Sequence, residues 1–191
     1  MRMRAPFHTP ATARALTLAI AMALAVSAPA AASPGHPEIR SALPDATLSG
    51  QARLRVWGFE VYDAALWVAP GFQAGDYTRH GFALTLHYLR DLDSPAIARR
   101  SIEEMRRVGS FDEAQATRWL AQLQTLIPDV KKGDRITGVS LPGGQVSFLL
   151  NGQATGTLRD PAFARLFFGI WLSPQTSEPR LRASLLTQAT P

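Results

Sequence analysis

Segments with strand periodicity and segments with helical periodicity fall into separate blocks in this sequence, and their order constrains the fold more than any other feature. Blocks of this kind are typical of α+β proteins, whereas parallel α/β sheets alternate strand and helix. We therefore expect a mainly antiparallel sheet covered by a helical layer. The expected strands are 53–68, 82–89, 135–141, 145–150 and 153–158, and the expected helices are 94–109, 112–127, 161–171 and 177–186.

Local signals mark the ends of these segments. The Asn-Gly pair at 151–152 joins the last two extended segments and strongly predicts a hairpin. Asp112, followed by glutamine three residues later, predicts a capping box at the start of the second helix. Ser94 and Asp160, each followed by proline, are expected to cap the first and third helices.

The N-terminus has the features of a secretory signal peptide. Arg2, Arg4 and Arg14 precede an uncharged apolar run over 15–26, and small residues follow, with cleavage expected after Ala32. The alternative is a membrane anchor, but a spanning helix needs about 20 apolar residues and this run is shorter. The sequence predicts a periplasmic or secreted protein with no stable membrane span after cleavage.

Three regions are expected on this basis: a signal peptide over 1–32, a flexible leader over 33–45 and one domain over 46–188. Removing residues 1–32 lowers the formal net charge from +5 to +2, because they contain three arginines and no acidic residue. Nucleic-acid binding normally needs a clustered basic surface. We therefore expect no nucleic-acid partner.

The sequence lacks the usual signatures of catalysis and of bound cofactors. It contains no cysteine, which excludes thiolate nucleophiles, thiolate zinc sites and iron–sulfur clusters. The histidines that follow the signal peptide lie in no metal-binding spacing, and there is no phosphate loop, dinucleotide fingerprint or nucleophile elbow. We expect no metal and no cofactor, and the sequence identifies no catalytic residue.

Four polar residues among apolar neighbours are candidates for a ligand site. Arg53 and Arg55 share a strand face with two aromatic residues, so they could bind an anionic oxygen while the rings hold an apolar body. The alternative is that they are solvated or paired with acids such as Asp63. Tyr62 could orient an oxygenated ligand and His87 could donate a proton near neutral pH, with structural roles as the alternatives.

The sequence also resembles a known family. The residues that carry the resemblance are LSGQAR at 48–53, GFEVYDAALW at 58–67, YLRDL at 88–92, KGDRI at 132–136, FFGIWL at 167–172 and PRLR at 179–182. This ordered set spans almost the whole domain and is similar to the bacterial, exported branch of the chalcone isomerase-like family. The resemblance implies an open-faced β-sandwich, in which a large antiparallel sheet is covered by a helical layer with a ligand cleft between them.

The resemblance also bears on catalysis. In the plant enzymes of the family, a strand arginine, a strand threonine, and a helix-borne tyrosine, lysine and asparagine hold the chalcone. The arginine corresponds to Arg53 or Arg55, the threonine position falls near Glu60, and residues 93–100 contain none of the other three types. Chalcone cyclisation is therefore not expected. Fatty-acid binders of the family need only an arginine for the carboxylate and an apolar cleft.

Three functions follow as hypotheses. The first is a non-catalytic periplasmic binder of a small apolar or amphipathic ligand such as a fatty acid. The second is an isomerase or intramolecular lyase of unidentified substrate, in which His87 or a tyrosine replaces the missing family residues. The third is an envelope accessory protein that acts through a protein partner, with its cleft filled by side chains.

Overall fold

The computed structural model describes Met1 and residues 36–189, so the predicted signal peptide, apart from Met1, lies outside the described residues. Residues 36–189 belong to one compact unit. Its elements in chain order are α1 (Pro37–Ala42), β1 (Thr47–Val56), β2 (Phe59–Val68), the 3₁₀ helix η1 (Ala74–Arg79), β3 (Phe82–Tyr88), α2 (Ser94–Val108), α3 (Glu113–Leu126), β4 (Arg135–Leu141), β5 (Gln145–Leu150), β6 (Gln153–Arg159), α4 (Pro161–Leu172) and α5 (Pro179–Leu185).

The six strands form one antiparallel sheet in which every strand pairs with its neighbours in the sequence. In the central strands Tyr62 lies opposite Tyr88, and Leu86 lies opposite Ile136. Because side chains alternate between the two faces of a strand, these residues form rows on one face of the sheet. The expected α+β class with an antiparallel sheet is confirmed.

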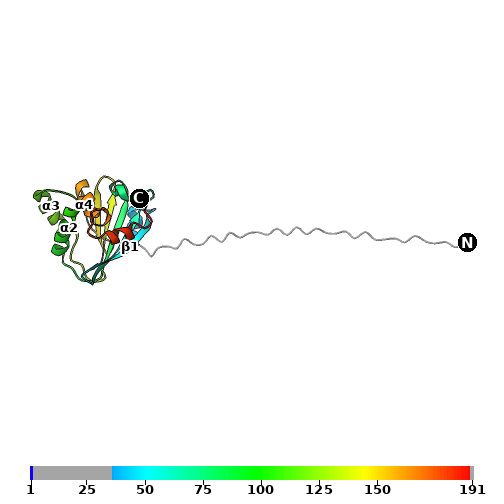
Figure 1. Cartoon of the computed structure of the whole chain (residues 1–191), viewed down its shortest axis with the longest axis horizontal. Helices are drawn as coiled ribbons and strands as arrows, with labels where there is room; N and C mark the ends of the chain where they lie inside the picture. The colour runs from blue at the N-terminus through cyan, green and yellow to red at the C-terminus, as the bar shows by residue number, and fades with distance from the viewer. Residues whose placement is uncertain (2–35, 190–191) are drawn as a thin grey trace. The chain divides into compact units, whose positions relative to one another are not determined.

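Helices α2, α3 and α4 cover one face of this sheet (Figure 1). Fully buried aromatic side chains fill the space between the layers, among them Phe148 from the sheet, Trp119 from α3 and Phe163 from α4. Helix α5 packs beside β1, where the Ser49 hydroxyl donates a hydrogen bond of 2.9 Å to the Leu185 carbonyl. Within the described part of the chain, no helix is long and apolar enough to cross a bilayer.

The cap signals are confirmed with one shift. Asp112 and Gln115 form the expected capping box of α3, and the Asp160 carboxylate accepts hydrogen bonds from two backbone amides at the start of α4. Helix α2 is capped by Asp93 in place of Ser94, because the Asp93 carboxylate accepts a hydrogen bond of 2.7 Å from the Ala96 amide.

The segment 53–68 is not one strand, as the sequence pattern predicted, but part of a hairpin. Strand β1 begins at Thr47 and ends at Val56, and the chain turns at Trp57 and Gly58, whose φ angles are +50° and +83°. Two positive φ angles in a row characterise the tight turn that suits twisted strands. Tryptophan is a rare residue at such a position, which is why the sequence did not signal a turn.

The second correction concerns the leader. Within the predicted flexible segment 33–45, residues 37–42 form helix α1, whose Ile39 is only 2% exposed. Ile39 and Leu43 pack with Trp67 and other apolar side chains on the sheet face opposite α2 and α4. The Glu38 carboxylate accepts a hydrogen bond of 2.9 Å from Arg135 on β4, which attaches the helix to the sheet.

Candidate functional site

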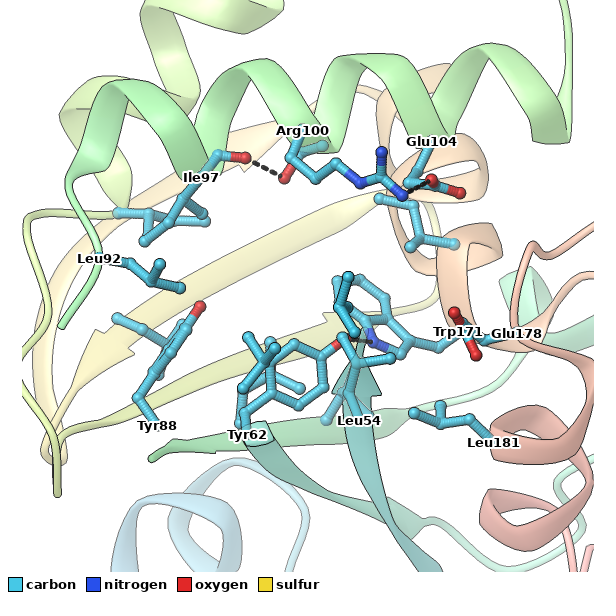
Figure 2. Close-up of a pocket in the computed structure, with 18 of the residues that line it drawn as sticks. Leu54, Tyr62, Tyr88, Leu92, Ile97, Arg100, Glu104, Trp171, Glu178 and Leu181 are labelled. Carbon is cyan, nitrogen blue, oxygen red and sulfur yellow. Dashed lines mark hydrogen bonds and ion pairs between the residues drawn. The ribbon is translucent and has the colours of Figure 1, made fainter. Parts of the chain in front are cut away.

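A cavity of about 610 Å³ lies between the sheet and the helices α2, α4 and α5. Its wall is mainly apolar, and the side chains come from the sheet and from the helices that cover it (Figure 2). The apolar lining is Leu54, Val56, Trp57, Phe59, Val61, Leu84, Leu86, Leu92, Ala96, Ile97, Ile127, Ile136, Phe148, Phe167, Phe168, Ile170 and Leu181.

The alternation of the strands builds the floor of this cavity. Leu84, Leu86 and Tyr88 occupy every second position of β3 and all line the cavity. Gly138 on β4 lets the helical layer approach, because a Cβ atom there would lie only 3.2 Å from the Phe168 ring. The space is therefore bounded on this side by close packing of Gly138 against the Phe168 ring.

Two phenols stand on the floor, of which Tyr88 is buried and Tyr62 half-buried. The Tyr62 hydroxyl accepts a hydrogen bond of 3.0 Å from the Trp171 indole N–H, and the Tyr62 and Tyr88 rings meet edge to face with centroids 5.9 Å apart. The Tyr88 hydroxyl has no hydrogen-bond partner among the described residues. Burial raises the pKa of both phenols well above the usual value, since a phenolate would lose its water. Both groups are therefore neutral hydrogen-bond donors at physiological pH.

Helix α2 places an ion pair above the phenols (Figure 2). The Arg100 guanidinium lies 2.5 Å from the Glu104 carboxylate, and Arg107 approaches the same carboxylate at 3.5 Å. Glu104 is only 5% exposed, whereas much of the Arg100 side chain is exposed. Arg100 is thus a cation at the rim of an apolar cavity that already has a carboxylate partner.

The β1–β2 turn forms an exposed part of the cavity wall. Trp57 and Phe59 line the cavity and are also exposed to solvent. The Arg90 guanidinium, which follows β3, lies 5.8 Å from the centre of the Phe59 ring. Glu178, which precedes α5, completes the charged groups of the lining.

Of the four residues predicted from the sequence, only Tyr62 lies in the cavity wall. Arg53 and Arg55 point from the opposite face of β1, where the Arg53 guanidinium donates to Asp63 at 2.6 and 2.8 Å and both arginines donate to Glu60 at 2.8 Å. These hydrogen bonds to Asp63 and Glu60 raise the pKa of Arg53. The alternative interpretation, in which the arginines pair with acids such as Asp63, is therefore correct for Arg53.

His87 also lies away from the cavity. It is exposed on β3 between Leu86 and Tyr88, which face the opposite way and line the cavity. Among the described residues that line the cavity there is no histidine or lysine. The structure therefore brings none of Arg53, Arg55 and His87 to the cavity.

Sequence reasoning missed Arg100, Glu104 and Trp171 as cavity residues. Arg100 and Glu104 resemble an ordinary i, i+4 pair on a helix surface, and Trp171 lies in an apolar run of α4 that indicates core packing. One signal was present: residues 93–100 were the region aligned with the helix-borne polar residues of the family. Among the described residues, no group of histidine, aspartate and glutamate side chains has the arrangement of a metal site.

Comparison with known proteins agrees with this architecture. A family model described as chalcone isomerase-like matches residues 39–187. An uncharacterized protein of Haemophilus influenzae is 26% identical over 132 residues, or 68% of this chain and 63% of that protein, so the match spans less than two thirds of the relative. The crystal structure of a fatty-acid binding protein of Arabidopsis thaliana has a TM-score of 0.60 at 12% identity, covering 75% of this chain and 87% of that chain.

Proposed function

The chain belongs to the chalcone isomerase-like family, and from this premise we propose that it is an exported, non-catalytic binder of a small amphipathic ligand such as a fatty acid. The cavity is the observation that carries the proposal. Its volume of about 610 Å³ falls within the range of about 300–1,000 Å³ that small-molecule sites occupy. Its apolar wall suits an acyl chain, and the few polar groups suit a single headgroup.

Arg100 is the group that we assign to the ligand's carboxylate. A carboxylate entering between α2 and the phenols would replace Glu104 as the partner of Arg100, while Glu104 would retain Arg107 at 3.5 Å. The free hydroxyl of Tyr88 can donate a second hydrogen bond. Charge-assisted hydrogen bonds of this kind are the strong ones in buried sites.

The position of His87 supports binding over the isomerase alternative. An acid or base must lie within hydrogen-bond reach of the reacting atom, and His87 is on the far face of the sheet. The remaining candidates, Tyr62 and Tyr88, are poor acids and poor bases near neutral pH because burial raises their pKa. The cavity also weighs against the third hypothesis, which requires a cleft filled by side chains.

The first test is native mass spectrometry of protein purified from its own cells, with organic extraction of anything bound. We expect a co-purifying acid with an apolar body, and a mature mass that begins at Ser33 if export and cleavage occur as proposed. An apo mass that also fails to take up added dodecanoic or hexadecanoic acid would overturn the binding function. A mass that includes residues 1–32 would overturn the proposed export route.

The second test assigns the site. Arg100→Gln should weaken dodecanoate binding about tenfold or more, because a hydrogen bond to a charged group contributes about 1.5–3 kcal/mol. The double variant with Glu104→Gln avoids an uncompensated buried carboxylate and should show the same loss in isothermal titration calorimetry. Arg99→Gln, an exposed neighbour on the same helix, is the matched control and should bind normally. Equal affinity of all variants would place the carboxylate elsewhere.

A cavity-filling variant tests the acyl site independently of charge. The Ile97 side chain points from α2 into the cavity (Figure 2), so Ile97→Trp should remove space that the chain needs and abolish binding. Arg99→Trp adds the same ring outside the cavity and should not. If Ile97→Trp binds dodecanoate as the unmodified protein does, the ligand does not occupy this cavity.

A further inference from the structure

The β1–β2 turn carries an exposed apolar tip. Trp57 is 95% exposed, Phe59 64% and Val56 39%, and apart from Met1 these are the exposed large hydrophobic residues of the described chain. The three side chains lie side by side, because Val56 lies opposite Phe59 across the hairpin and Trp57 is in the turn between them. We call these three residues the tip.

Folding and solubility do not explain this arrangement. Trp57 has a φ of +50°, a left-handed conformation that is unfavourable for a bulky residue, while Gly58 next to it needs the same region. An exposed tryptophan also adds no buried area to the core. Clustered apolar residues that the fold does not bury indicate an interaction site.

We propose that the tip inserts into the interfacial layer of a phospholipid bilayer with anionic headgroups, so that the cavity takes up its ligand directly from the membrane. This inference rests on the proposed binding of an acyl ligand. Tryptophan has an amphipathic ring that favours the headgroup level of a bilayer. Val56, Trp57 and Phe59 also line the cavity, so a tip placed in the interface opens the apolar space toward the acyl chains.

Two cations near the tip are available to anionic headgroups, whereas the acids Glu60, Asp63 and Asp91 at this end of the sheet pair with other basic residues. Arg90 lies over the Phe59 ring and Lys132 lies in the neighbouring turn, and neither has an ion-pair partner among the residues that the structure describes. Lys131 in that turn pairs with Asp91 at 3.3 Å. The pairing of Tyr62 with Tyr88 and of His87 with Arg135 places all these groups at the same end of the sheet as the tip. Three apolar side chains and two free cations suit weak, reversible attachment.

Trp57 provides its own signal for a test. The other three tryptophans, Trp67, Trp119 and Trp171, are buried, so a blue shift of the emission on mixing with vesicles reports Trp57. The experiment uses the protein without residues 1–32, because the described residues contain a complete core and the N-terminal apolar run would bind lipid itself. Vesicles of phosphatidylcholine with phosphatidylglycerol should cause the shift and sediment with the protein.

Variants distinguish tip insertion from general adhesion. Trp57→Ser and Phe59→Ser should lose most vesicle binding, and Lys132→Gln should weaken it. Pro142→Ser, in the exposed β4–β5 turn at the opposite end of the sheet, is the matched control and should bind like the unmodified protein. Equal binding of Trp57→Ser, or no binding of the unmodified protein, overturns the proposal, and equal binding to pure phosphatidylcholine overturns the assignment to anionic headgroups.

Two further readouts separate the remaining outcomes. Analytical ultracentrifugation without vesicles should show a monomer, and a dimer that Trp57→Ser dissociates would overturn membrane docking in favour of a second copy at the tip. Dodecanoate binding is measured in vesicle-free solution. A protein that binds dodecanoate but no vesicle retains the proposed function and loses the docking inference, whereas one that binds vesicles but no dodecanoate loses the proposed function.

Discussion

Glu104 is the residue whose surroundings most restrict what the cavity can bind. Its carboxylate is buried and holds Arg100 at 2.5 Å, on the wall that faces the Tyr62 and Tyr88 hydroxyls. In the proposed function, a ligand carboxylate would have to compete with Glu104 for Arg100, and its affinity would be lower than a guanidinium without a carboxylate partner would give.

Removing that competitor should strengthen binding. Glu104→Gln keeps the size of the side chain and leaves Arg100 with only its exposed partner Glu103, so we expect dodecanoate to bind roughly fivefold more tightly, which corresponds to about 1 kcal/mol. Calorimetry with dodecanol, which has no charge, should show no such change. Glu103→Gln is the matched control, because Glu103 is an exposed partner of the same arginine at 3.4 Å. Weaker dodecanoate binding by Glu104→Gln would contradict the competition.

At this scale the sequence predicted residue types better than positions. An arginine and a tyrosine were expected beside an apolar space, and Tyr62 is there, but the sequence favoured Arg53 and Arg55 over Arg100. The choice between the two sheet faces depends on where β1 ends and on its irregular register near Leu54, and a one-residue slip moves a side chain to the other face. Arg100 depends on how α2 packs over the sheet, which periodicity does not encode.

At the scale of elements, Asp160 joins two helices. Its carboxylate caps α4 and also accepts a hydrogen bond of 2.9 Å from the Trp119 indole on α3. Trp119 is completely buried, so its N–H has no water to replace this partner. The cap therefore stabilises both the start of α4 and its packing against α3.

Asp160→Ala should consequently cost more stability than the loss of an ordinary cap. We expect a decrease of about 2–4 kcal/mol in the free energy of unfolding, since a cap contributes about 1 kcal/mol and an unpaired buried donor about 1–3 kcal/mol. Asp112→Ala removes the exposed cap of α3 alone and should cost about 1 kcal/mol. Urea unfolding measures both. Equal losses in the two variants would show that the bond to Trp119 contributes nothing.

The Glu38 carboxylate on helix α1 should make the stability of the protein depend on pH in acid. Burial opposes the ionisation of Glu38, but a backbone hydrogen bond and the Arg135 guanidinium outweigh it and lower the pKa of this carboxyl below 4.5. A lowered pKa contributes stability above the unfolded value, and this contribution is lost as the pH falls through the folded value. Glu38→Gln should destabilise the protein at neutral pH and match the unmodified protein in strong acid. A pH-independent difference in urea midpoints would contradict this.

The elements themselves could mostly be predicted. Strands β4 and β5 have the predicted bounds, and the predicted helices are present with shifts of a few residues, because alternation and caps are local signals. The two errors have a different cause. Helix α1 has only six residues and depends on Ile39 packing against Trp67, and the first hairpin has a Trp-Gly turn in place of a glycine or asparagine pair. Both depend on contacts or strain that no local pattern carries.

Across the whole molecule, the two faces of the sheet carry different kinds of side chains. One face carries the helical layer, the cavity, Tyr62 and Tyr88, and the other carries α1 and the ion pairs of Arg53 and Arg55 with Glu60 and Asp63. The charged residues of β1 and β2 therefore lie on the solvated face. In the proposed function, the polar ligand contacts would come from Arg100 on α2 and from the phenols of Tyr62 and Tyr88.

The raised pKa values of the tyrosines predict how the stability of the protein changes in alkali. All three tyrosines of the chain, Tyr62, Tyr77 and Tyr88, have a pKa that burial raises from 10, for Tyr77 to about 12. A pKa that is higher in the folded state contributes stability below 10 and loses it as the pH rises from 10 through the folded value. The free energy of unfolding should thus fall steadily above pH 10.

Near-ultraviolet absorbance measures the phenolates directly, and no cysteine is present to interfere. We expect little phenolate absorbance in the folded protein near pH 10, followed by a joint rise of all three groups when circular dichroism shows unfolding. In denaturant the three tyrosines should titrate near 10. Phenolate absorbance near pH 10 while the protein is still folded would show that water reaches at least one phenol. A bound acyl ligand, which fills the space beside Tyr62 and Tyr88, should shift the joint rise to higher pH.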